Sequence, residues 1–138
     1  MTDYLLDTNA CIALINGHPP SVRVRFQKAS AAGERILVSS IALFELWYGI
    51  AKSTKQDLNR KRLETFLAGA ILILPFEDAD SQAAGLLRAT LEAMGRPIGA
   101  YDLLVAGQAL RDGLTLVTSN VREFSRVKGL LWEDWAKP

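Results

Sequence analysis

Three acidic residues of this chain lie inside apolar runs, where hydrophobic side chains would be expected. Asp7 follows the run Tyr4 to Leu6, Glu45 lies within Ile41 to Trp47, and Asp102 precedes Leu103 to Ala106. Burying an isolated carboxylate is costly, so such a residue usually has a charged partner or binds a cation. If the three carboxylates converge in the folded chain, a divalent cation would compensate their charge. Metal-assisted hydrolysis would then be the chemistry to expect.

Each of the three carboxylates also has a purely structural explanation. Asp7 is suited to cap the helix that follows it, although Thr8 and Asn9 add more side-chain oxygens than one cap requires. Glu45 is a good helix former and would be explained by a position facing water. Asp102 would be favoured by the helix dipole alone. Position favours a shared site, because each residue is predicted near the sheet edge at which parallel strands end.

Further polar side chains follow two of the predicted strands. Ser39 ends one strand, and Thr118 and Asn120 end another, where they could hydrogen-bond a ligand or a metal-bound water. Glu123 comes one helical turn later. Ordinary turn residues have the same composition, so this group supports a site only in combination with the three acids.

The other reactive side chains have ordinary explanations. Cys11 lies in an apolar stretch and is predicted to be a small buried hydrophobe, and His18 lies in a loop and is predicted at the surface. The chain contains no Walker loop, dinucleotide fingerprint, nucleophile elbow or zinc-type spacing. The remaining acids lie in polar stretches, turns or near the chain end and are predicted to be solvated; they are Glu34, Asp57, Glu64, Asp80, Glu92, Asp112, Glu133 and Asp134.

The apolar runs and capping residues predict an α/β fold. The expected strands cover 4–6, 36–38, 71–74, 114–117 and 130–132, and the expected helices cover 10–15, 21–32, 41–52, 56–68, 80–94, 101–112 and 122–124. Continuous apolar strands separated by helices indicate a mostly parallel sheet of four to five strands flanked by helices. We expect one domain over residues 1–138, with helix 41–52 buried and Leu58 on the inner face of helix 56–68.

Composition limits the classes of protein to which the chain can belong. It has 138 residues, of which 49% are hydrophobic and 22% charged, as in ordinary soluble domains. It shows no apolar run of membrane-spanning length and no basic, apolar signal peptide, so we expect a cytoplasmic protein without a membrane partner. The net charge of +1 gives no global basic excess. The basic residues from Lys52 to Arg62 are expected on a solvated helix face, unless an acidic site nearby needs its anionic substrate held.

A site built from carboxylates favours the hard cations Mg²⁺ and Mn²⁺. Crowded carboxylates repel one another, which raises the pKa of some of them unless a cation intervenes. Such a cation binds phosphate oxygens and lowers the pKa of an attacking water. Phosphodiester hydrolysis is therefore the reaction that best uses these residues, and it requires no histidine.

Four segments of the chain resemble the motifs of PIN domains. They are Leu5-Leu6-Asp7-Thr8-Asn9, Ser39-Ser40-Ile41-Ala42-Leu43-Phe44-Glu45-Leu46-Trp47-Tyr48-Gly49, Pro97-Ile98-Gly99-Ala100-Tyr101-Asp102 and Leu116-Val117-Thr118-Ser119-Asn120-Val121-Arg122-Glu123-Phe124. In order and spacing they are similar to the VapC toxins of bacterial toxin–antitoxin pairs, including the closing Glu133-Asp134-Trp135. The resemblance extends over the whole chain.

The resemblance implies an Mg²⁺- or Mn²⁺-dependent endoribonuclease with Asp7, Glu45 and Asp102 at the metal-site positions. Many PIN domains carry a fourth acid where this chain has Asn120, and Glu123 is the candidate substitute. The catalytic candidates are therefore Asp7, Glu45, Asp102 and Glu123, supported by the polar residues Thr8, Asn9, Ser39, Thr118 and Asn120.

The resemblance also implies partners. It implies a homodimer, a VapB-like antitoxin that covers the acidic pocket, and contact with operator DNA only through that antitoxin. It implies structured RNA substrates, with tRNA, notably initiator tRNA, among the candidates. Two other functions stay open: a non-catalytic RNA- or partner-binding domain, which Asn120 makes credible, and a phosphohydrolase that acts on a small phosphate ester.

Overall fold

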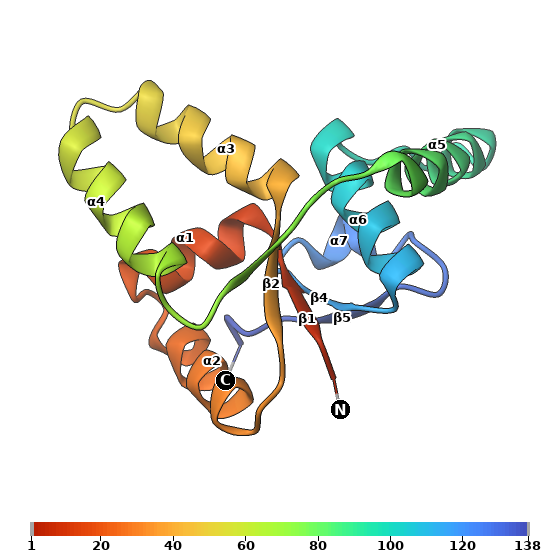
Figure 1. Cartoon of the computed structure of the whole chain (residues 1–138). Coiled ribbons are helices and arrows are strands. Elements are labelled where there is room, and N and C mark those ends of the chain that lie inside the picture. Colours follow the sequence, from red (N-terminus) through yellow and green to blue (C-terminus); the bar gives the residue numbers. More distant parts are fainter. Residues whose placement is uncertain (1, 138) are drawn as a thin grey trace.

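The protein, described here by a computed structural model, has one parallel β-sheet between two layers of helices (Figure 1). Within the described residues, 2–137, the strands are β1 (Tyr4–Leu6), β2 (Ile36–Ser39), β3 (Leu72–Leu74), β4 (Thr115–Val117) and β5 (Leu131–Glu133). Their order is β3-β2-β1-β4-β5, and every neighbouring pair is parallel. The predicted α/β fold with a mostly parallel sheet is confirmed.

Seven helices connect the strands over residues 2–137. They are α1 (Thr8–Asn16), α2 (Pro20–Ala31), α3 (Ser40–Ala51), α4 (Gln56–Leu67), α5 (Asp78–Ala93), α6 (Ala100–Asp112) and α7 (Val121–Phe124). Asp7 and Ser39 cap α1 and α3 through their side chains. Gly113 ends α6 with a φ of 65°, a conformation that glycine adopts without steric strain. None of these helices has the length and apolar character that crossing a lipid bilayer would require.

The sheet separates two hydrophobic cores, because alternate strand residues face opposite sides. Leu6 and Val38 pack with α1 to α4, on the left of Figure 1. Leu5 and Leu116 pack with α5 to α7 on the right. Cys11 is fully buried in the first core, as predicted. This arrangement holds the ends of the central strands between the two helical layers.

The prediction that helix 41–52 is buried all round is wrong. In α3 only Ala42 and Leu46 are buried, whereas Phe44, Trp47 and Tyr48 are 52%, 39% and 57% exposed. The helix packs against α1, α4 and α6 and leaves one face uncovered. A helix that is apolar on every side gives no signal of which face is open, so the sequence could not identify it.

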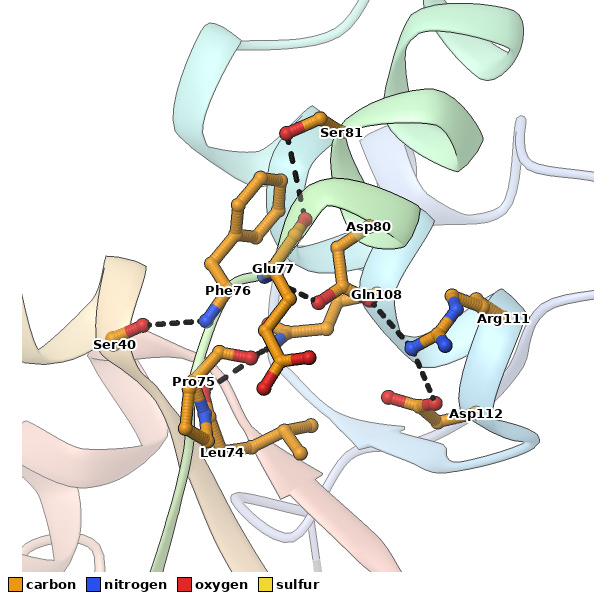
Figure 2. Close-up of polar contacts among 10 residues, drawn as sticks. All are labelled: Ser40, Leu74, Pro75, Phe76, Glu77, Asp80, Ser81, Gln108, Arg111 and Asp112. Carbon is orange, nitrogen blue, oxygen red and sulfur yellow. Dashed lines mark hydrogen bonds and ion pairs between the residues drawn. The ribbon is translucent and has the colours of Figure 1, made fainter.

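The predicted exposure of Asp80 and the predicted burial of Leu58 are also wrong. Asp80, expected to be solvated, is only 1% exposed, and its Oδ2 accepts a 2.8 Å hydrogen bond from the Glu77 amide at the start of α5. Its Oδ1 pairs with Arg111 Nη1 of α6 over 3.3 Å (Figure 2). Leu58, expected on the inner face of α4, is 45% exposed, and Leu63 is the buried residue of that helix. The ion-pair partner of Asp80 lies on another helix, so the residues that neighbour Asp80 along the chain gave no sign that it would be buried.

Candidate active site

The carboxyl ends of β1, β2 and β4 meet at one edge of the sheet. From β1 the chain continues outward to β2 and β3, and it returns later to add β4 on the other side of β1. The crevice at such a reversal is the usual ligand position in open α/β sheets. The Asp7 amide donates to the Val117 carbonyl over 3.1 Å, which joins the ends of β1 and β4. Polar side chains that follow these strands are therefore brought together.

Asp7 is buried in this crevice, with an exposed fraction of 5%. Its Oδ1 accepts a 2.8 Å hydrogen bond from the Ala10 amide, so the residue caps α1. Burial raises the pKa of Asp7, hydrogen bonds from Thr118 and from the capping amide oppose this, and the charges of Glu45 and Asp134 raise it further. The cap explains where Asp7 lies, but it does not explain why other acids surround it.

Glu45 is partly buried in the second turn of α3. The Thr8 hydroxyl donates to Glu45 Oε1 over 2.8 Å, so the first residue of α1 fixes this carboxylate. The charge of Glu45 raises the pKa of both Asp7 and Asp102. Glu45 is therefore electrostatically part of the crevice rather than an isolated surface acid.

Asp102, Asn120 and Glu123 form a hydrogen-bonded group where α6 and α7 border the crevice. Asn120 Nδ2 donates to Glu123 Oε2 over 2.6 Å and to Asp102 Oδ2 over 3.3 Å. The Gly99 amide donates to Glu123 Oε1 over 3.0 Å and so fixes the other carboxylate oxygen. The backbone amide of Asn120 donates to Thr118 Oγ1 over 2.9 Å. Asn120 thus acts as a neutral donor between two carboxylates.

The two carboxylates of this group differ in proton affinity. Burial raises the pKa of Asp102 to about 7, and the hydrogen bond and charge of Glu123 act in the same direction, as do the charges of Asp7 and Glu45. The side-chain amide of Asn120 lowers the pKa of Glu123. At neutral pH, Asp102 is therefore partly protonated while Glu123 is ionised.

The segment between β3 and α5 ties α3 to α6, the helices that carry Glu45 and Asp102 (Figure 2). Ser40 Oγ, at the start of α3, accepts a 2.9 Å bond from the Phe76 amide. Gln108, fully buried in α6, donates from Nε2 to the Pro75 carbonyl over 3.0 Å. These contacts, although outside the crevice, constrain how the two helices meet at its edge.

Two of the predicted supporting residues are oriented differently from the rest. Ser39 is fully buried, and its Oγ accepts a 3.0 Å bond from the Ile41 amide as the cap of α3. Asn9 is exposed in the first turn of α1. Within residues 2–137, neither side chain forms a hydrogen bond with the carboxylates of the crevice.

Asp134 is a nearby acid that was predicted to be solvated, although it lies in the closing segment of the family resemblance. It follows β5, and its charge raises the pKa of Asp7. It lines a small hollow together with Asn9 and Thr118. The Thr118 amide donates to the Glu133 carbonyl over 3.0 Å, so the end of β5 lies beside the end of β4. The prediction of ordinary solvation is therefore incomplete for Asp134, which follows a parallel strand just as Asp7 does.

The side chains of the crevice are chemically suited to a hard divalent cation. They supply carboxylate, hydroxyl and amide oxygens, which Mg²⁺ and Mn²⁺ prefer. Burial is the first cause of the raised pKa of Asp102, and the charges of Glu123, Asp7 and Glu45, which a cation would offset, raise it further. Within residues 2–137, no three Asp, Glu, His or Cys side chains converge closely enough to enclose an ion. An ion here would bind one or two carboxylates and keep several waters, as Mg²⁺ commonly does.

Comparison with known proteins shows the family of the chain. Residues 4–130 match the PIN domain family. The chain belongs to the PIN-domain family. This PIN domain is 41% identical over 136 residues to the tRNA(fMet)-specific endonuclease VapC of Shigella flexneri, covering 99% of this chain and 100% of the relative. It is also 41% identical over 134 residues to the ribonuclease VapC2 of Rickettsia felis, covering 97% of this chain and 98% of that protein.

Solved structures share the PIN fold over nearly the whole chain. VapBC2 from Rickettsia felis, crystallised with a DNA fragment from its promoter, has a TM-score of 0.89 and 39% identity, covering 96% of this chain and 98% of the other. DNA-bound VapBC from Salmonella typhimurium has a TM-score of 0.89 and 38% identity, covering 98% and 99%. The predicted resemblance to PIN domains of the VapC type is confirmed.

Proposed function

We propose that this PIN domain is an Mg²⁺- or Mn²⁺-dependent endoribonuclease that acts as the toxin of a toxin–antitoxin pair in the cytoplasm. The observation that supports this most is the grouping of Asp7, Glu45, Asp102 and Glu123, which come from separate elements, around one crevice. The charge of Glu45 raises the pKa of Asp7 and Asp102, and carboxylates crowded in this way are suited to a cation that activates water against a phosphodiester. The two relatives at 41% identity, both named as nucleases, support the same activity.

Asp7, Asp102 and Glu45 are the residues that would hold the cation, one or two of them directly and the rest through its waters. A bound cation would supply charge stabilisation at the phosphate and a lowered pKa for the attacking water. The hydroxyl of Thr8 orients Glu45 through its bond to Oε1, so that carboxylate is fixed before any substrate arrives.

Glu123 is the candidate proton acceptor. The carboxylate is ionised at neutral pH and so can accept a proton from water, although the hydrogen bond from Asn120 lowers its pKa and makes it a weaker base. The Gly99 amide and Asn120 Nδ2 hold its two oxygens separately, which fixes the direction in which the carboxylate points.

Asn120→Asp adds a carboxylate between Asp102 and Glu123. We expect it to tighten Mg²⁺ binding by roughly tenfold, because one more negative charge lies a few ångströms from the cation. In EDTA the same variant should melt at a lower temperature than the parent. The amide that donates to Asp102 and Glu123 is then replaced by a carboxylate that repels both of them. Isothermal titration calorimetry and thermal melting measure both effects, with Gln27→Glu on the exposed surface of α2 as the control. Unchanged Mg²⁺ affinity would place Asn120 outside the cation site.

The substrate and the antitoxin are inferred from the relatives. The Shigella flexneri protein is named for tRNA(fMet), so we infer structured RNA, with tRNA as the first candidate, as the substrate. Two of the matching structures are VapBC complexes bound to DNA. We therefore infer a VapB-like antitoxin that inhibits the nuclease, with operator DNA contacted only through the antitoxin.

A homodimer is inferred through an aromatic face on α3 and α6. This face consists of Phe44, Trp47, Tyr48 and Tyr101, which are all at least 39% exposed. The rings of Phe44 and Tyr101 lie 5.6 Å apart between centroids. An exposed cluster of large apolar side chains is typical of an interaction surface, and a twofold axis through it would let the cluster pack on itself.

Tyr48→Arg should convert the dimer to a monomer at micromolar concentration. In a dimer of the variant, the two introduced arginines would repel each other near the twofold axis. Lys52, which lies over the ring of Tyr48, would add to this repulsion. Light scattering after size-exclusion chromatography measures the mass. Leu86→Arg, on the exposed surface of α5, makes the same change elsewhere and should leave the dimer intact. A dimer that persists in Tyr48→Arg would contradict the proposed face.

The proposed activity is tested by incubating the purified protein with total cellular RNA, with and without Mg²⁺ or Mn²⁺, and mapping new 5′ ends. We expect cleavage at a small number of sites, dependent on the cation and suppressed by EDTA. RNA binding without any new 5′ ends would contradict the proposal and favour a non-catalytic binding domain.

A further inference from the structure

A hollow opens between α1, α3 and α4 beside the acidic crevice. It has a volume of about 230 Å³. Its lining is mainly apolar and includes Ile12 and Ile15 of α1, Leu46 of α3 and Leu63 of α4. Glu45 also lines it, although the charge of this carboxylate acts on Asp7 and Asp102. The hollow and the crevice are therefore adjacent and share Glu45.

Gly49, one helical turn after Glu45, forms part of the wall of this hollow. A Cβ built at Gly49 would meet no atom within 4 Å, and the residue is not among the glycines with positive φ. By contrast, a Cβ at Gly107 of α6 would lie 2.9 Å from Ala84, so close packing explains that glycine. Glycine inside a helix is unfavourable relative to alanine. At Gly49, neither packing nor backbone conformation offsets this cost, and the effect of the missing side chain is to leave the hollow open.

The border of the hollow on α4 is positively charged. Arg62 and Asn59 line this border. Among residues 2–137, no carboxylate forms an ion pair with Arg62. Asp57, the nearby acid of α4, already lies 3.6 Å from Arg60. Arg62 therefore favours an anionic group on the α4 side of the hollow, whereas Glu45 disfavours one on the α3 side.

We infer that the hollow receives an unpaired nucleotide of the RNA substrate, next to the phosphodiester that is cut. The apolar lining suits the face of a base, and Arg62 suits a phosphate. A base stacked in a duplex cannot enter such a hollow, so the substrate must present an unstacked nucleotide, as loops and bulges do. The inference rests on the proposed function, because it takes the adjacent acidic crevice as the place of cleavage.

Gly49→Leu tests the inference by filling the hollow. A helical side chain at this position leans over the preceding turn, into the space beside Leu46 and Glu45. Gly85→Leu is the matched control, because Gly85 lies inside α5, is exposed, and also has no atom within 4 Å of a built Cβ. Each variant is assayed for cleavage of an RNA hairpin with an unpaired loop and for hydrolysis of bis(4-nitrophenyl) phosphate, a diester without a base. Binding of the same hairpin is measured in EDTA by fluorescence anisotropy.

We expect Gly49→Leu to lower kcat/KM on the hairpin by about tenfold or more and to weaken hairpin binding similarly. Hydrolysis of the base-free diester should be unchanged, and Gly85→Leu should behave like the parent. Equal hairpin cleavage by Gly49→Leu and the parent would overturn the inference while leaving the proposed function standing. A parallel loss on both substrates would also overturn it, because the variant would then act through Glu45.

Two further outcomes separate this inference from its alternatives. If Gly49→Leu cleaves RNA normally but no longer binds a co-expressed antitoxin, the occupant is a protein segment and the inference is wrong. If the parent cleaves no RNA, the proposed function fails. The binding measurement then decides alone: weaker hairpin binding by Gly49→Leu than by Gly85→Leu supports a nucleotide site, and equal binding overturns it.

Discussion

Asp102→Asn is expected to abolish RNA cleavage while the fold survives. The substitution removes one charge from the carboxylates that would hold the cation, and the loss of such an electrostatic group typically costs about a hundredfold or more in kcat. The new amide has the same shape, and its oxygen can still accept the bond from Asn120 Nδ2. Initial rates on a structured RNA with Mg²⁺, measured beside circular dichroism, test both parts of the expectation.

The control for this variant is Asp78→Asn. Asp78 is an exposed acid in the first turn of α5, so its replacement makes the same chemical change away from the crevice. The control should cleave RNA at the rate of the parent. Full cleavage by the Asp7→Asn, Asp102→Asn double variant would show that the carboxylates are not the catalytic groups.

The stability of the protein in EDTA is expected to fall as the pH rises from about 4 to about 7. Asp102 has a pKa of about 7 in the folded chain, against about 3.9 in an unfolded one. Between these values the folded state binds more protons than the unfolded state, so the free energy of unfolding decreases with pH and levels off above the folded value. Burial raises the pKa of Asp7 in the same direction. The lowered pKa of Glu123 acts only at the acidic end, below its ordinary value near 4.3.

Urea unfolding at several pH values measures this dependence. Asp102→Asn should show a shallower fall and should be more stable than the parent at pH 8 in EDTA. Adding Mg²⁺ should then stabilise the parent more than the variant, because the cation binds the folded crevice through the charge that the variant lacks. A parent whose stability rises steadily from pH 4 to pH 7 would contradict the raised pKa of Asp102.

The fold was predictable because its signals are local. Short apolar runs mark the strands, and Asp7, Ser39 and Gly113 mark helix ends, so the ends of the expected helices and strands differ from the observed ones by two residues at most. Strand order is not local. The approach of Asp7 to Asp102 depends on β4 pairing with β1, and the sequence alone supported this only through the rule for parallel sheets.

The features that sequence analysis missed depend on distant contacts. Asp80 reads as a surface acid, yet it is buried because Arg111 of another helix reaches it. Asp134 reads as a chain-end acid, yet β5 brings it near Asp7. The role of Asn120 as a donor to two carboxylates also requires the structure, because the sequence shows only that an acid is missing there.

The most direct test of the account is anomalous diffraction from crystals of the protein grown with Mn²⁺. We expect a manganese peak within coordination distance of the carboxylates of Asp7 and Asp102, with waters completing its shell, and no such peak in Asp102→Asn. A peak bound to other residues, or none in the parent at millimolar Mn²⁺, would contradict the claim that these acids form one cation site.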